Sequence, residues 1–209
     1  MPIVARNVFK PALGFVLSLP LLWLAYLIYL ELISPPSGLG PDPAEGLLHF
    51  LGEWSLIMLL IAFSVTPLRR RLRLLILGRC RRMAGLFAFT YVVMHLVTYM
   101  VLYVELSWAL LLEDFYERTY ITAGMASFLI LLMMALTSTR GWQLRLGRYW
   151  RSLHTLIFAA VPLALLHLLW LRKDGYLDTT LYALWFAIMV LERLQAKGYL
   201  SRATPPGAA

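Results

Sequence analysis

The sequence predicts an all-α integral membrane protein, built as a bundle of six transmembrane helices with both termini cytoplasmic. Of its 209 residues, 61% are hydrophobic and 14% are charged, whereas a soluble domain is about half apolar and a quarter charged. The 19 Lys and Arg residues lie in short runs between long apolar segments. That pattern sets membrane orientation and argues against nucleic-acid binding, despite the net charge of +8.

The apolar runs predict the individual helices. A transmembrane helix needs about 18 or more apolar residues. Five runs meet that length and a sixth is shorter; in order they are 11–33, 47–66, 83–104, 120–139, 153–171 and 179–191. The first run is too long for a cleavable signal peptide, and no small-residue cleavage site follows it. We expect one transmembrane domain over residues 1–195 and a short, disordered cytoplasmic tail over 196–209.

The segments between the runs fit this division. The stretch "SPPSGLGPDP" (34–43) breaks the first helix with Pro and Gly, and "TPLRRR" (66–71) ends the second on the inner side. The acidic stretch 105–119 carries apolar residues and Trp108. We expect it to lie along the outer membrane interface, where amphipathic aromatic side chains settle.

The distribution of charge predicts the orientation. With the N-terminus inside, all Lys and Arg residues fall on the inner side except Arg118, Arg172 and Lys173. The acidic residues fall outside or at the outer helix ends, and Glu192 is the one exception. The positive-inside rule therefore favours cytoplasmic termini.

The single cysteine, Cys80, limits the possible cofactors. It excludes an internal disulfide, a cysteine-ligated iron–sulfur cluster, a four-cysteine zinc site and a C-x-x-C-H haem attachment.

The four histidines are the strongest functional candidates, because each lies within a predicted span, where ionisable side chains are rare. Counted from the inner helix ends at about 1.5 Å per residue, the depths of His95 and His167 differ by about 5 Å. Two imidazoles at one depth on neighbouring helices can bind one planar macrocycle, which predicts axial haem ligation. His49 lies further out and is a spare candidate. The alternative for any one histidine is an ordinary inter-helix hydrogen bond.

His154 begins the fifth span on the inner side and has no histidine partner at its depth. Fourteen residues before His95, on nearly the same helical face, the chain has Arg81. A guanidinium there suits a haem propionate or a flavin phosphate, or it only fixes topology. His154 and His167 point to different faces of an ideal helix. Pro162 lies between them, and a kink there would realign them; otherwise the inner site faces another cleft.

Several segments together resemble a known family, the haem-binding membrane subunit of the bacterial protein-methionine-sulfoxide reductase system (the MsrQ/YedZ type), within the ferric-reductase-like transmembrane group. The resemblance covers roughly residues 38–171. Its segments are "GLGPDP" (38–43), "HFLGEW" (49–54), "TPLRR" (66–70), "RRMAGLFAFTYVVMHL" (81–96), "RTYITAG" (118–124), "LTSTR" (136–140) and "LGRYWRSLH" (146–154). One position departs from the family pattern, because Thr119 stands where a proline is usual. We expect that change to alter a loop and leave the histidines untouched.

The resemblance implies a six-helix b-type cytochrome of the bacterial inner membrane, with one or two haem b groups and an association with FMN. It implies electron transfer from the quinone pool or a cytosolic flavin reductase to a periplasmic molybdopterin methionine-sulfoxide reductase, which repairs oxidised periplasmic proteins. No substrate-converting site is expected in this subunit. The essential histidines of the family match His95, His154 and His167. A histidine at His49 and an arginine at Arg81 also belong to the pattern.

Two other functions compete with electron transfer. A proton or ion transporter would use the histidines as a relay, but the residues between them in the third and fifth runs are mainly apolar. A direct ferric reductase usually carries a C-terminal flavin and nicotinamide domain, and here the sequence ends soon after the sixth run. Glu53, one turn from His49, is a candidate hydrogen-bond partner for a ligand or a quinone.

Overall fold

The structure, a computed structural model, describes residues 3–36, 38–74, 76–172 and 175–196, and every regular element within them is an α-helix. The predicted tail, 196–209, lies outside the described residues apart from its first residue. The helices are α1 (Ile3–Ile33), α2 (Pro43–Arg71), α3 (Leu77–Leu102), α4 (Trp108–Glu117), α5 (Thr119–Leu136), α6 (Arg140–Leu146), α7 (Arg148–Thr155), α8 (Ile157–Leu171) and α9 (Leu177–Ala196).

The described part contains five helical segments long and apolar enough to cross a membrane. They are Phe9–Ile33, Pro43–Arg71, Cys80–Leu102, Thr119–Leu136 and Arg148–Leu171. These segments match the first five predicted spans and make the chain a multi-pass membrane protein. The sixth predicted span, 179–191, lies within α9 but is not among these segments, so its crossing stays a prediction.

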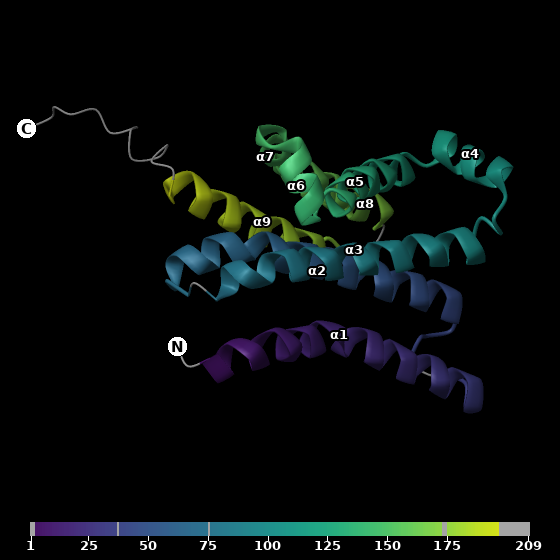
Figure 1. Cartoon of the computed structure of the whole chain (residues 1–209). Coiled ribbons are helices and arrows are strands. Elements are labelled where there is room, and N and C mark those ends of the chain that lie inside the picture. Colours follow the sequence, from purple (N-terminus) through teal and green to yellow (C-terminus); the bar gives the residue numbers. More distant parts are fainter. Residues whose placement is uncertain (1–2, 37, 75, 173–174, 197–209) are drawn as a thin grey trace, which may run out of the picture.

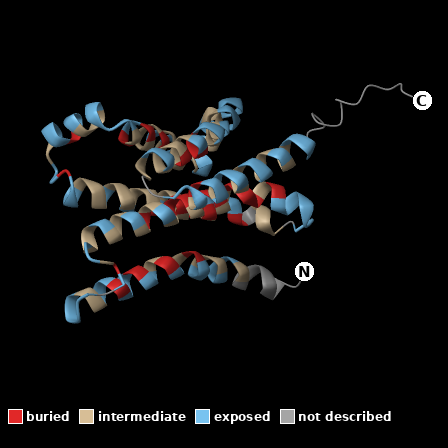
Figure 2. Cartoon of the chain, turned by 180° about the vertical axis from the view of Figure 1, so that it is seen from behind, coloured by how far each residue is buried: buried red, intermediate tan, exposed pale blue. Residues whose placement is uncertain are grey.

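Helix α2 lies at the centre of the bundle. It packs along α3 and also contacts α8, α9 and α1, while α5 pairs with α8. Its fully or nearly fully buried side chains include Leu51, Leu60 and Phe63, and the buried residues gather along α2 where the other helices cover it (Figure 2). Helix α1 runs beside this group at the edge of the bundle (Figure 1). It is tied in by the buried Tyr91 of α3, which donates its hydroxyl to the Leu17 carbonyl over 2.9 Å.

Helix α2 ends within the segment predicted to end it, "TPLRRR" (66–71), although it first passes through a proline. It starts at an N-cap, Asp42, whose carboxylate accepts the amide of Ala44 over 2.9 Å. It then continues through Pro67 to Arg71. Proline normally breaks a helix, because it lacks an N–H and frees the carbonyl four residues earlier. Here the freed carbonyl of Phe63 accepts a hydrogen bond from Arg193 Nη2 at 2.6 Å.

The fifth span is interrupted, but not at Pro162, which lies inside α8. The interruption is at Leu156, between α7 and α8. The amide of Leu156 bonds the Leu153 carbonyl at 3.1 Å, and the amide of Ala159 bonds the Leu156 carbonyl at 2.9 Å. This three-residue spacing tightens the helix just after His154.

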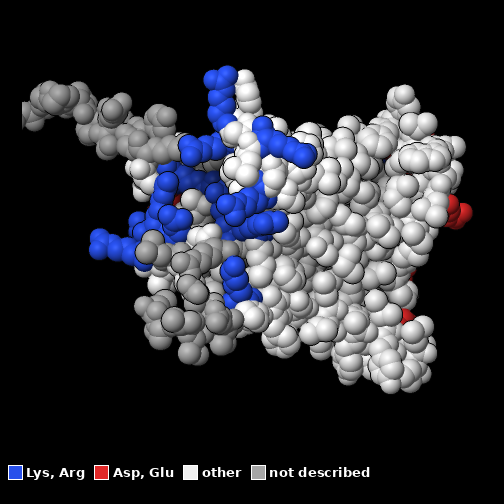
Figure 3. Space-filling view, in the orientation of Figure 1, with Lys and Arg blue, Asp and Glu red and all other residues white. Residues whose placement is uncertain are grey.

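Charge is segregated along the bundle. Lys and Arg gather at one end, and most of the visible Asp and Glu lie at the other (Figure 3). The start of α1 and the end of α9 both lie at the basic end (Figure 1). This segregation agrees with the predicted orientation, although which compartment each end faces stays a prediction. The acidic stretch 105–119 contains α4, with Trp108 and Tyr116 exposed. The Tyr99 hydroxyl of α3 donates a hydrogen bond to Asp114 of α4.

Candidate functional site

The structure brings two of the predicted site residues together. His95 comes from the middle of α3 and His167 from α8. The centroids of their imidazole rings are 6.3 Å apart, and the ring planes cross at 79°. Counting residues from the helix ends predicted this common depth.

Each ring is held by a backbone carbonyl of a neighbouring helix. His95 Nδ1 lies 3.1 Å from the Leu48 carbonyl of α2, and His167 Nδ1 lies 2.7 Å from the Tyr120 carbonyl of α5. A carbonyl oxygen only accepts, so each Nδ1 carries the hydrogen and donates it. The second nitrogen, Nε2, then keeps its lone pair, which is the tautomer that binds a metal.

The spacing of the rings suits one metal ion between them. A bond from a metal to an imidazole nitrogen is about 2 Å, and each ring centroid lies roughly 1 Å beyond its Nε2, so a shared ion requires centroids roughly 6 Å apart. The observed 6.3 Å agrees with that value. His95 and His167 would hold an iron through their Nε2 atoms, and a cofactor such as haem would supply its other ligands.

Two glycines allow the rings to reach these carbonyls. Gly52 lies one turn after Leu48, and Gly124 lies one turn after Tyr120. A Cβ on Gly52 would lie 3.0 Å from His95 Cε1, and one on Gly124 would lie 2.7 Å from His167 Nδ1. A side chain at either position would therefore displace the imidazole.

His154 is held in the same way but at a different place. Its Nδ1 donates to the Trp150 carbonyl at 3.1 Å, and its ring stacks on the Trp150 indole with centroids 4.0 Å apart. The Met134 backbone of α5 also interacts with this imidazole. Arg81 on α3 lies close enough to His154 to interact with it electrostatically. Arg81 forms no hydrogen bond or ion pair with any residue that the structure describes.

The structure does not bring His49 into the pair. Its side chain is 57% exposed, and its Nε2 lies 4.0 Å from Glu45 on the same helix. Unlike the other three histidines, His49 makes no hydrogen bond to a carbonyl within the described residues. Glu53 was predicted to be a hydrogen-bond partner of a ligand. Its carboxylate accepts a hydrogen bond from the hydroxyl of Tyr182 on α9 at 2.8 Å.

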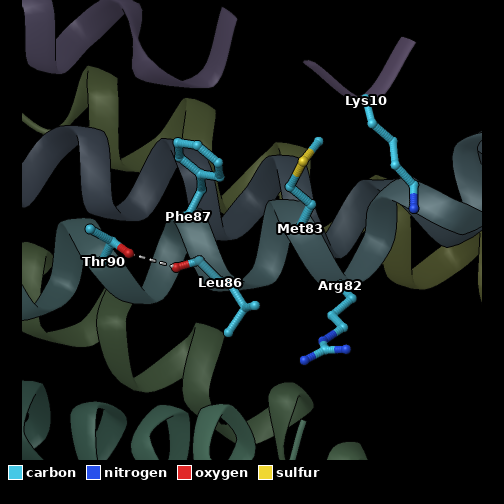
Figure 4. A pocket seen from close by; sticks show the side chains of 6 residues that line it. All are labelled: Lys10, Arg82, Met83, Leu86, Phe87 and Thr90. Atoms are coloured by element: carbon cyan, nitrogen blue, oxygen red, sulfur yellow. Dashed lines mark hydrogen bonds between the residues drawn. The ribbon is translucent and has the colours of Figure 1, made fainter. Parts of the chain in front are cut away.

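Two further observations limit the site. Within the described residues, no three His, Cys, Asp or Glu side chains are grouped so as to hold a metal ion by themselves. An open cavity of about 380 Å³ lies between α1 and α3, with Lys10 and Arg82 at the basic end and the apolar Met83, Leu86 and Phe87 beside them (Figure 4). None of the predicted site residues lines it, so the paired histidines and this cavity are separate features.

Gly52, Gly124 and Arg193 were not among the predicted site residues. The two glycines had a detectable signal, because Leu48 and Tyr120 each precede their histidine by 47 residues and each is followed one turn later by a glycine. The role of Arg193 depends on how α9 packs against α2, which no local pattern reveals.

Comparison with known proteins agrees with the resemblance found in the sequence. Residues 51–165 match the family model described as "Ferric reductase like transmembrane component". Similar relatives carry the name "Protein-methionine-sulfoxide reductase heme-binding subunit MsrQ". The one from Xanthomonas euvesicatoria pv. vesicatoria is 41% identical over 81% of this chain and 80% of its own. The one from Caulobacter vibrioides is 37% identical over 89% and 87%, and one from Xanthomonas campestris pv. campestris is 36% identical over 94% and 92%.

Proposed function

Because the chain belongs to the ferric-reductase-like transmembrane family, and within it to the MsrQ heme-binding subunits, we propose that it is the haem-binding, electron-transferring subunit of a methionine-sulfoxide reductase system in the bacterial inner membrane. The relatives are named as heme-binding subunits of such a reductase. The observation that carries the proposal for this chain is the pairing of His95 with His167.

The residues around this pair fit a haem b. The ring separation of 6.3 Å matches one shared iron, and both Nε2 lone pairs are free to bind it because both Nδ1 atoms donate to carbonyls. Bound there, haem supplies a one-electron carrier, since its iron alternates between ferrous and ferric states.

The protein's own contribution is orientation. The Leu48 and Tyr120 carbonyls fix the tautomer and rotation of the two rings, and they raise the basicity of the ligating nitrogens. Gly52 and Gly124 provide the space for this arrangement. A fixed pair of ligands lowers the reorganisation that accompanies each change of charge, which favours electron transfer over substrate conversion at this site.

A second, inner station is proposed around His154 and Arg81. His154, whose Nδ1 donates to the Trp150 carbonyl, is the proposed ligand, and Arg81 is a cation without an ion-pair partner in the described residues. The inner cofactor is a second haem or the FMN that the family resemblance implies. Electrons would enter here from a quinol or a cytosolic flavin reductase.

The outer end is proposed to deliver electrons to a periplasmic molybdopterin methionine-sulfoxide reductase. Helix α4 carries the exposed acids Glu113 and Glu117 at the end of the bundle opposite the basic cluster. Exposed charge of one sign promotes docking of a partner with the opposite sign. His49 lies at this outer level and is a spare rather than a proposed ligand.

A reduced-minus-oxidised absorption spectrum of the purified full chain, with a haem-to-protein ratio, tests the proposal. We expect a b-type band that is lost in both His95→Ala and His167→Ala and kept in His49→Ala, the matched control on an exposed face. A colourless wild-type protein would favour a transporter instead. A band unchanged in the first two variants would overturn the ligand assignment.

A further inference from the structure

Arg193, near the end of α9, occupies an unusual position for an arginine. Its Nη2 donates to the Phe63 carbonyl at 2.6 Å, which is the carbonyl that Pro67 leaves without a helical partner. Its guanidinium lies over the Phe63 ring at 3.8 Å from the centroid and near the Phe158 ring at 5.1 Å. It is therefore held between α2 and α8 within the apolar bundle.

The hydrogen-bonding capacity of this guanidinium is not used up. Arg193 Nε is buried and has no hydrogen-bond partner within the described residues. The neighbouring acid, Glu192, pairs with Arg71 at 3.2 Å instead. Since guanidinium stays charged and a buried charge without a counterion is costly, the site lacks an anion.

Other cations converge on the same region. Arg81 and Arg70 lie close enough to Arg193 for electrostatic repulsion between the charges. Arg81 also lies close enough to His154 to interact with it electrostatically. Phe158, which Arg193 approaches, lies only four residues after His154. Arg81 is therefore near both Arg193 and His154, and neither arginine forms an ion pair with a described carboxylate.

We infer that Arg193 and Arg81 together bind the anionic group of the cofactor held at His154, a carboxylate or a phosphate. This inference rests on the proposed function and adds a residue that the sequence did not mark. Guanidinium groups bind both anions through paired N–H donors. The anion would accept from the orphaned Nε of Arg193 while Nη2 stays on the Phe63 carbonyl.

A purely structural role is the competing explanation, in which Arg193 only satisfies the Phe63 carbonyl. Pro67→Ala separates the two roles, because it restores the amide that bonds this carbonyl within α2. In the double variant Pro67→Ala/Arg193→Gln the carbonyl is satisfied without arginine. Only an anion-binding role then still requires residue 193 to be arginine.

The experiment measures haem-to-protein and FMN-to-protein ratios of the purified full chain for wild type, Arg193→Gln, Pro67→Ala and the double variant. We expect Arg193→Gln and the double variant to lose the inner cofactor, and Pro67→Ala to retain it. If the anion is a propionate of a second haem, the haem ratio falls by half. If the anion is the FMN phosphate, the FMN ratio falls and the haem ratio stays. Arg81→Gln should repeat the effect.

Several results would overturn the inference. A double variant with wild-type ratios would leave Arg193 with only the structural role, and unchanged ratios in Arg193→Gln would likewise exclude anion binding. If Arg193→Gln does not fold, Arg193→Lys keeps the charge but not the paired donors, and normal cofactor retention in it would argue against paired binding. Wild type without any haem refutes the proposed function itself, whereas a His95-dependent band with an unaffected Arg193→Gln refutes this inference alone.

Discussion

The imidazole ring centroids of His95 and His167 are 6.3 Å apart. Each ring donates to a backbone carbonyl of a neighbouring helix, and that helix has a glycine one turn after the carbonyl. The two halves of the site thus use the same construction, with α2 supporting α3 and α5 supporting α8. A residue one turn after the carbonyl shares its helical face. Its side chain would fill the space that the imidazole needs, which explains why glycine occupies both positions.

Gly124→Ala should therefore impair the site. Its Cβ would lie 2.7 Å from His167 Nδ1, so the ring must move and lose the Tyr120 carbonyl. We expect a strong fall in the haem-to-protein ratio, measured by absorption of the purified protein. Gly52→Ala should act in the same direction but less, because its nearest imidazole atom would be 3.0 Å away.

Gly85→Ala is the matched control for both substitutions. Gly85 is also inside a helix, yet a Cβ there would meet nothing within 4 Å. We expect an unchanged haem ratio and a gain in stability of up to about 1 kcal/mol, since alanine favours helix over glycine. Equal haem loss in Gly85→Ala and Gly124→Ala would argue against the steric explanation.

Thr119→Pro should be tolerated, and it restores the residue that is usual in the family. Thr119 is the first residue of α5, where the backbone N–H has no hydrogen-bond partner within the helix. Arg118, the residue before it, has the extended backbone that proline requires of its predecessor, with φ −122° and ψ 91°. We expect thermal unfolding to shift upward by an amount equivalent to about 0.4–1 kcal/mol, with the haem ratio unchanged. Thr122→Pro, inside α5, should instead destabilise by about 3 kcal/mol; similar melts for the two variants would refute the helix-start explanation.

Position 119 also illustrates what the sequence could and could not predict. The departure from the family pattern was expected to alter only a loop, but Thr119 is helical and the next residue, Tyr120, supplies the carbonyl that holds His167. The depth of His95 and His167 was predictable, because helical rise is nearly constant. Partner carbonyls were not, because they depend on how two helices pack.

The two prolines show the same limit. The segment 66–71 was predicted to end α2, and the helix ends there at Arg71, but only after passing through Pro67. Pro162 was a candidate kink, yet the fifth span is interrupted at Leu156 instead. Whether a helix continues through proline depends on whether another group satisfies the freed carbonyl. For Pro67 that group is Arg193, from a helix more than a hundred residues later in the chain.

The exposed acids of α4 should affect delivery of electrons rather than cofactor binding. Asp114 is already engaged by Tyr99 and by Arg118 at 3.3 Å, whereas Glu113 and Glu117 are exposed. In Glu113→Gln/Glu117→Gln we expect electron transfer to the proposed periplasmic partner, purified separately, to slow by on the order of threefold to tenfold at low salt. The difference should fade as added salt screens the charges.

Stopped-flow oxidation of the reduced protein by that partner measures the effect, and the haem spectrum should stay as in wild type. Glu192→Gln is the control, because it removes an acid at the opposite, basic end, where Glu192 pairs with Arg71. An equal loss of rate in the control, or a loss that persists at high salt, would exclude docking through α4.

Helix α9 should cross the membrane, although its sequence is less apolar than the other spans. It contacts α2 through Tyr182 and Glu53 at 2.8 Å, and through Glu192 and Arg71 at 3.2 Å. Helix α9 has 20 residues, which is about 30 Å at about 1.5 Å per residue, and the hydrocarbon core is about 30 Å thick. A helix of that length packed along α2 is long enough to span the core. Reporter fusions test this: alkaline phosphatase should be active when joined at Gly175 and inactive when joined after Ala196, and green fluorescent protein should give the opposite pattern. Phosphatase activity at both positions would mean that α9 stays on the outer side and that the chain crosses five times.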